Sequence, residues 1–215
     1  MNYYERFLKL KQFTDSVGPI YGTEDFGIYF YSVIKMMKPK SILELGTGLG
    51  TTMLWAAQAL DENNQGKIHT IDDGSEWDYL KKARDQMGEY FREDYLFYIE
   101  NLIDSFNVRK FVEFHPVEIK EIQSDNPIDI LFSDFAHGPS DVLKLLAEFL
   151  PQMNSYSKIY IDSASTHYGS YHTLEKVIDM LNQNTIPLSI LERSTNEKIH
   201  QVIHTSQFHL DHIVE

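Results

Sequence analysis

The stretch SILELGTGLGTT, residues 41–52, decides the fold of this chain. Three apolar residues surround Glu44 and predict a short buried strand. The glycines that follow predict a tight turn into a helix whose buried stripe begins at Met53. Because glycine has no Cβ, the turn can adopt unusual backbone angles and a ligand can lie against the main chain. The free N–H groups at the start of the helix then favour an anionic group on the turn.

The spacing of the glycines excludes two common phosphate-binding turns. A P-loop ends in Gly-Lys-Ser/Thr, and no lysine follows Gly50. The dinucleotide fingerprint G-x-G-x-x-G requires a glycine at the position of Thr51. The chain instead places glycine at every second position from Gly46 to Gly50.

This compact spacing, with Glu44 two residues ahead of the first glycine, resembles motif I of the class I S-adenosylmethionine-dependent methyltransferases. The resemblance implies that Glu44 faces the methionyl amino group and that the turn from Gly46 to Gly50 passes under the cofactor. An ordinary strand-to-helix turn of an α/β protein is the alternative. The cofactor-binding residues that follow from the resemblance are Glu44, Gly46, Thr47, Gly48, Thr51, Asp72, Asp73 and Asp134.

A second element, KIHTIDD at residues 67–73, predicts a β-branched strand that ends in an acid. A doubly wound sheet places at this point the carboxylate that accepts both hydroxyls of a ribose. Asp72 is therefore the expected ribose ligand. NAD-binding folds use the same arrangement, so Asp72 supports an adenosine-containing ligand more strongly than it distinguishes S-adenosylmethionine from NAD.

The composition predicts one soluble domain. The 215 residues contain no Pro/Gly/Ser-rich linker and no repeat, and the absence of cysteine excludes disulfides and zinc thiolate sites. A formal net charge of −13 argues against a nucleic-acid substrate, because the phosphate backbone favours a basic face. The N-terminus lacks the form of a signal peptide and no apolar run approaches the ~20 residues of a membrane span. We expect a cytoplasmic protein that binds neither nucleic acid nor membrane.

The whole chain, residues 1–215, is expected to be a single methyltransferase domain. Residues 1–40 form a helical lid in this prediction, with one helix over Tyr3–Phe13, a loop at residues 16–19 and a second helix from Thr23. Residues 41–205 form a Rossmann-like core, and residues 206–215 a tail. The resemblance implies a seven-stranded, mostly parallel sheet with helices on both faces. Its closing antiparallel hairpin would use residues 188–191 and 199–204.

The segment from Gly74 to Asn107 is predicted to form two helices rich in aromatic residues. Its aromatics favour core packing, with a homodimer interface as the alternative. Trp77 lies close enough to Asp72 in the sequence to approach the adenosine. The third strand is expected at Phe111–His115, and His115 is interpreted as a strand residue without a role.

The expected catalytic residues follow the fourth and fifth strands, Ile128–Asp134 and Lys158–Asp162. Within the methyltransferases, this part of the chain resembles the catechol, caffeoyl-CoA and macrocin types. The resemblance places Asp134 and Asp162 at two positions that hold a divalent metal. The third position is Ser163, a poorer ligand for magnesium than a carboxylate or amide. We therefore expect a mechanism without bound metal, with Mg²⁺ as the alternative.

His137 is the expected general base, because an imidazole with a pKa of about 6.5 can accept a hydroxyl proton at neutral pH. Asp134 would orient or polarise the acceptor, while His167 and His172 compete for the role of base. The predicted reaction is methyl transfer from S-adenosylmethionine to a hydroxyl of a small molecule. An NAD-dependent oxidoreductase and a cofactor-binding module without catalytic activity are the alternatives.

Overall fold

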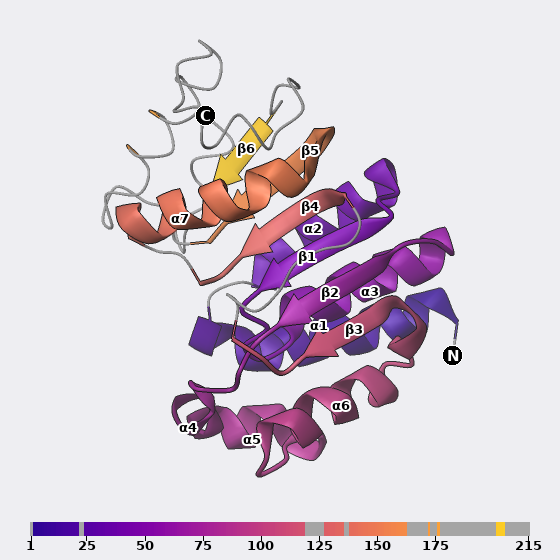
Figure 1. The fold of residues 1–215 in the computed structure, drawn as a ribbon. Helices are drawn as coiled ribbons and strands as arrows, with labels where there is room; N and C mark the ends of the chain where they lie inside the picture. Colours follow the sequence, from indigo (N-terminus) through magenta and orange to yellow (C-terminus); the bar gives the residue numbers. More distant parts are fainter. Residues whose placement is uncertain are drawn as a thin grey trace. The chain divides into compact units, whose positions relative to one another are not determined.

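The computed structural model describes residues 2–21, 24–118, 127–135, 138–162, 172, 176 and 201–204. The chain divides into two compact units. Residues 1–40 and 46–122 form the first unit, and residues 41–45 and 123–215 form the second. Both units combine parallel strands with helices (Figure 1).

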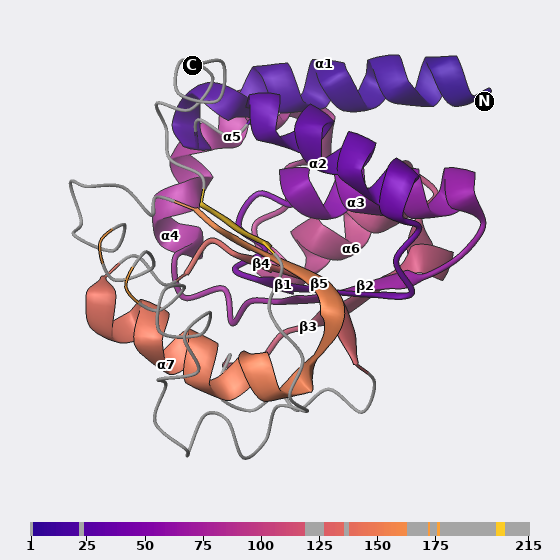
Figure 2. The same ribbon diagram turned by 90° about the horizontal axis from the view of Figure 1, so that it is seen from above.

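Three helices pack together in the first unit: α1 (Tyr3–Tyr21), α2 (Glu24–Met37) and α3 (Thr51–Asn63). They lie on one side of β2 (Figure 2). The fully buried Trp55 of α3 fills the space between them, and its Nε1 donates to Thr14 Oγ1 at 2.9 Å. A Cβ at Gly27 would lie only 2.2 Å from the Trp55 ring, so α2 and α3 approach closely because residue 27 is glycine.

Helix α1 is longer than the sequence predicted, because it continues through residues 16–19, where a loop was expected. The reason is its buried stripe, which runs through Leu10, Phe13, Thr14 and Val17 at helical spacing. Pro19 lacks an N–H, but its fixed φ is compatible with a helix and only one backbone hydrogen bond is lost. Tertiary packing therefore outweighs a local helix-breaking signal.

Strands β2 (Lys67–Ile71) and β3 (Val112–His115) pair in parallel in the first unit. In the sequence, α6 (Tyr95–Ser105) lies between these two strands, and the Asp94 side chain caps its first turn. The prediction of two helices in this segment was wrong in part, because short helical turns precede the one long helix. These turns are α4 (Trp77–Leu80), η1 (Lys81–Ala83), α5 (Arg84–Met87) and η2 (Gly88–Tyr90), and η3 (Arg109–Phe111) leads into β3.

The second unit contains four parallel strands: β1 (Ser41–Leu45), β4 (Ile128–Ser133), β5 (Met153–Ile161) and β6 (Gln201–His204). Helix α7 (Pro139–Phe149) covers one side of β4 and β5 and is followed by the turn η5 (Leu150–Gln152) (Figure 2). The predicted buried face of α7 is confirmed, and its members are Val142, Leu145, Leu146, Phe149 and Leu150. Within this unit the strand order is β1-β4-β5-β6, so β1 lies beside a strand that is distant in the sequence.

The predicted closing hairpin is not present in the described part of the chain. The strand expected at residues 199–204 forms as β6, but it runs parallel to β5. Residues 162–200 connect the two strands, which is ample for the crossover that a parallel pair requires. Residues 188–191 lie outside the described residues. The described residues therefore contain six strands, against the seven expected, and the strand pairs within each unit are parallel.

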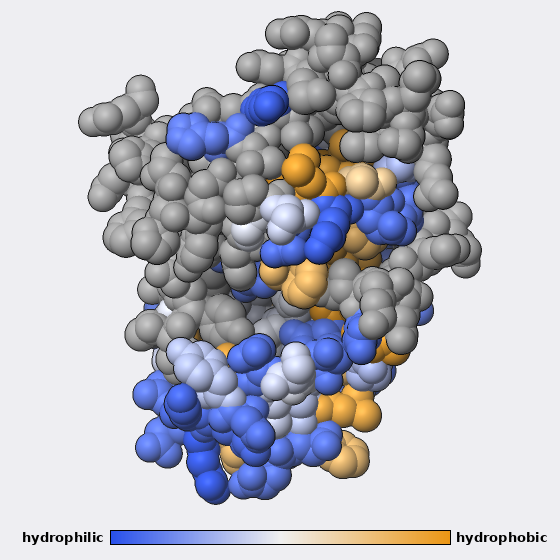
Figure 3. Space-filling view, turned by 60° about the vertical axis from the view of Figure 1, so that its left-hand side comes forward, coloured by the Kyte–Doolittle hydropathy of each residue, from blue (hydrophilic) through white to orange (hydrophobic). Residues whose placement is uncertain are grey.

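Hydrophilic residues dominate the lower part of the face drawn in Figure 3, and apolar residues form small separate groups between them. Groups of that size are ordinary on protein surfaces. None of the helices in the described ranges combines the length and the apolar composition of a membrane span.

Candidate cofactor and active site

The glycine turn leads directly from β1 into α3. Gly46, Gly48 and Gly50 all have positive φ, of 89°, 52° and 78°. A side chain with a Cβ would strain each of these positions, which explains the alternating glycines. The Gly46 N–H donates to the Ile71 carbonyl at 2.9 Å, and the Gly50 N–H donates to the Thr47 carbonyl at 2.8 Å. The turn is therefore tied both to itself and to the end of β2.

Asp72 lies at the end of β2 and holds the turn with its carboxylate. Its Oδ2 accepts the Gly48 N–H at 2.9 Å, and its Oδ1 accepts the Gly74 N–H at 2.8 Å. A carboxylate has about four lone-pair sites, so two remain for a ligand's hydroxyl groups. Gly74 also has positive φ, and a Cβ there would lie 2.7 Å from the Tyr95 ring. Asp72, which the sequence predicts to bind the ribose, is therefore hydrogen-bonded to the glycine turn.

Side chains from α6 support the turn from behind. Tyr95 donates its hydroxyl to the Gly48 carbonyl, and Tyr98 donates to the Leu49 carbonyl, both at 3.0 Å. The two tyrosines are buried, and Trp77 stacks on Tyr98 with ring centroids 4.9 Å apart. Sequence reasoning placed these aromatics in a core but did not connect them to the turn. The only available signal was their helical spacing in residues 95–105.

Two threonines lie beside the turn in the first unit. Thr47 lies in the turn, and its hydroxyl is 2.5 Å from that of Thr70 on β2. Thr51 is the first residue of α3 and is buried. The N-terminus of α3 has no side-chain cap and no acidic residue in its first turn. Its N–H groups and its dipole therefore favour a negatively charged group on the turn.

Asp73 is exposed, in contrast to Asp72. Its Oδ1 accepts the Ser75 N–H at 2.9 Å, and hydrogen bonds from Ser75 lower the pKa of the Asp73 carboxyl. Trp77 donates its indole N–H to the Glu93 carbonyl at 2.8 Å and is nearly buried. Both residues are therefore engaged in local structure next to the turn.

The second unit brings three predicted acids to one edge of its sheet. Glu44 is fully buried in β1, one residue before the strand ends. The Asp134 N–H donates to the Leu45 carbonyl at 2.9 Å, and the Asp162 N–H donates to the Ser133 carbonyl at 2.8 Å. The carboxyl ends of β1, β4 and β5 therefore lie at the same level. Open α/β sheets bind ligands at this edge, near the point where the strand order reverses.

Several predicted residues are not positioned by the described structure. His137, Ser163 and His167 lie outside the described residues, whereas His172 is described and exposed. These roles stay predictions.

Comparison with known proteins identifies the family to which this chain belongs. The family model described as "Methyltransferase domain" matches residues 43–164, which is more than half of the chain. The chain belongs to this methyltransferase family. No protein of curated function matches its sequence.

Solved structures resemble the fold at low sequence identity. The O-methyltransferase TomG from Streptomyces achromogenes has a TM-score of 0.51 and 17% identity, over 80% of this chain and 78% of TomG. An O-methyltransferase described as putative from Klebsiella pneumoniae has a TM-score of 0.52 and 15% identity, over 74% of this chain and 68% of that one. At these identities the likeness establishes the Rossmann-like methyltransferase fold.

Proposed function

We propose that this protein transfers a methyl group from S-adenosylmethionine to a hydroxyl of a small molecule. The observation that carries the proposal is the direct bond between the Asp72 carboxylate and the Gly48 N–H at 2.9 Å. It joins the residue expected to bind a ribose to the turn expected to bind the methionyl part. TomG, a structural neighbour, was crystallised in complex with S-adenosylmethionine, which supports the choice of cofactor.

The cofactor would use both the main chain of the turn and a few side chains. Asp72 offers its remaining lone pairs to the ribose hydroxyls, and the buried carboxylate of Glu44 would receive the methionyl amino group. The free N–H groups at the start of α3 suit the cofactor's carboxylate. The full proposed set is Glu44, Gly46, Thr47, Gly48, Thr51, Asp72, Asp73 and Asp134.

Methyl transfer needs a sulfonium, an acceptor oxygen in line with it, and an acceptor for the hydroxyl proton. S-adenosylmethionine would supply the methyl group: the acceptor oxygen would form a bond to the methyl carbon while the sulfur keeps the electron pair of the broken S–C bond. The products would be the methyl ether, S-adenosylhomocysteine and a proton. His137 would take that proton, and Asp134 and Asp162 would orient the acceptor. Ser163 at the third ligand position disfavours a Mg²⁺ ion, so we propose a metal-free transfer.

The acceptor is proposed to be a small molecule, in line with the O-methyltransferases among the structural neighbours. The net charge of −13 disfavours nucleic acid. Residues 1–40 would serve as a lid over a core of residues 41–205 in a single domain. A homodimer is the proposed assembly, and sedimentation velocity tests it.

Calorimetric titration with S-adenosylhomocysteine and with NAD tests the proposed cofactor. Saturable binding of S-adenosylhomocysteine and none of NAD is the expected result, and the reverse would establish the oxidoreductase alternative. Turnover is then tested with hydroxylated compounds before and after chelation. Binding without any turnover would favour the non-catalytic module. Full turnover at neutral pH after His137→Ala would remove His137 from the mechanism.

A further inference from the structure

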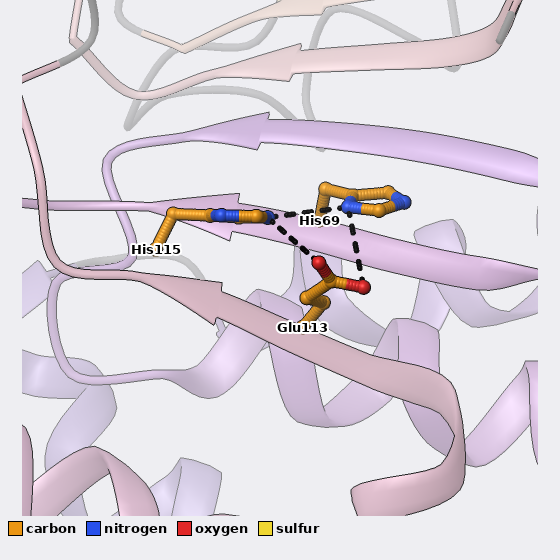
Figure 4. Close-up of side chains that lie close together, drawn as sticks. All are labelled: His69, Glu113 and His115. Atoms are coloured by element: carbon orange, nitrogen blue, oxygen red, sulfur yellow. Dashed lines mark hydrogen bonds and ion pairs between the residues drawn. The ribbon is translucent and has the colours of Figure 1, made fainter. Parts of the chain in front are cut away.

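Three potential metal ligands converge on the strand pair β2 and β3 in the first unit: His69, Glu113 and His115 (Figure 4). His69 lies opposite Glu113 in the parallel register, and His115, opposite Ile71, is two pairs further along. Because alternate residues of a strand share a face, Glu113 and His115 project to the same side of β3. Phe114, between them, points the other way and contacts Tyr95.

One of the distances between the donor atoms matches the requirement of a tetrahedral ion, and the other two are about half an ångström longer. His69 Nδ1 lies 3.2 Å from His115 Nε2. The Glu113 oxygens lie 3.9 Å from His69 Nδ1 and 3.8 Å from His115 Nε2. Zinc–nitrogen bonds of 2.0–2.1 Å at tetrahedral angles place neighbouring donor atoms about 3.3 Å apart. Small rotations of the Glu113 side chain would complete three corners of such a site.

We infer that His69, Glu113 and His115 form a binding site for a zinc ion. Two imidazoles and one carboxylate are a common zinc ligand set, and they leave a fourth position for water. The three side chains keep between 27% and 45% of their surface exposed, so an ion can reach them. The proposal stands independently of the cofactor site, because none of the three residues takes part in it.

Lys67 supports the carboxylate from the side. Its ammonium group donates to Glu113 Oε2 at 3.0 Å. Glu113 can bind zinc through Oε1 while Oε2 keeps this hydrogen bond, as outer-shell partners of metal ligands commonly do. A zinc ion would also fix the end of the strand pair, because the His115 carbonyl accepts the Asp72 N–H at 3.2 Å.

Zinc binding is tested on the full chain after treatment with a chelator and exchange into metal-free buffer. ZnCl₂ is titrated in competition with a chromogenic chelator, and CoCl₂ is added separately to record the visible bands of tetrahedral cobalt. We expect one high-affinity equivalent of zinc and a tetrahedral cobalt spectrum. Glu113→Gln and His115→Asn should each weaken zinc binding by at least about 100-fold, the upper end of the effect of outer-shell changes.

Two controls separate this site from other histidines. His172→Asn changes an exposed histidine outside the cluster and should leave zinc affinity unchanged. The double variant His209→Asn, His212→Asn changes two histidines near the end of the sequence and should also leave zinc affinity unchanged. Circular dichroism confirms that each variant is folded. The inference is overturned if the wild type binds no zinc equivalent, or if folded Glu113→Gln and His115→Asn bind zinc as tightly as the wild type. The cluster would then be an imidazole hydrogen bond and ion pair only.

Discussion

Replacing Asp72 with asparagine tests the link between the glycine turn and the cofactor. The carboxylate accepts two backbone N–H groups, from Gly48 and Gly74. Asparagine keeps one acceptor oxygen and turns its NH₂ group toward the second N–H, so one charge-assisted bond is lost. Because hydrogen bonds to charged groups contribute about 1.5–3 kcal/mol and this site is half-exposed, we expect a loss of about 1.5 kcal/mol in unfolding free energy.

The effect on cofactor binding should be larger than the effect on folding. Loss of the negative charge and of one acceptor for the ribose hydroxyls should cost about 2–3 kcal/mol of binding free energy, which corresponds to a Kd about 30- to 150-fold higher. Calorimetric titration with S-adenosylhomocysteine measures this change, and urea unfolding measures the change in stability. Asp85→Asn, on the exposed face of α5, is the matched control for the loss of one charge. A Kd for Asp72→Asn within threefold of the wild-type value would refute the reasoning.

Three further substitutions test the glycine turn and the contacts among α1, α2 and α3 in the first unit. Gly50 has φ 78°, and a Cβ there would lie 3.0 Å from a Leu102 methyl group. Gly50→Ala should therefore lower the free energy of unfolding by at least about 1–2 kcal/mol. An unchanged midpoint in urea unfolding would contradict this. Thr14→Val removes the acceptor of the buried Trp55 N–H and should cost about 1–3 kcal/mol, whereas a neutral result would mean that the indole finds another partner. Tyr31→Phe removes a 2.5 Å hydrogen bond to Glu62 and should cost about 1.5 kcal/mol at pH 7.

The last of these effects should depend on pH with a definite sign. Burial raises the pKa of Glu62, but hydrogen bonds from Tyr31, Gln58 and Lys35 outweigh this effect, so the pKa lies below the ordinary value of a glutamate, 4.5. A depressed carboxyl pKa stabilises the fold above the unfolded-state pKa and loses this effect as the pH falls through the folded-state value. The difference between wild type and Tyr31→Phe should therefore shrink below pH 4.5 in urea titrations. A difference that grows toward acidic pH would contradict the assignment.

Features that depend on local pattern could be predicted before folding was considered. The strand, the glycine turn and the helix of residues 41–63 could be predicted because positive φ at alternating positions requires glycine. The buried face of α7 followed from its apolar spacing. The acid at the end of β2 could be expected at the turn because the carboxyl ends of parallel strands lie at one edge of a sheet.

Contacts between residues that are distant in the sequence could not be predicted and are seen only in the folded chain. Tyr95 and Tyr98 of α6 donate hydrogen bonds to the turn. His69 and His115 lie side by side on two neighbouring strands, although they are 46 positions apart in the sequence. Helix α1 continues past Pro19 because the buried contacts of Leu10, Phe13 and Val17 outweigh the local signal. Hydrophobic periodicity and composition indicate which conformation a segment prefers. Strand register and helix packing determine which side chains face one another, and both exist only in the folded chain.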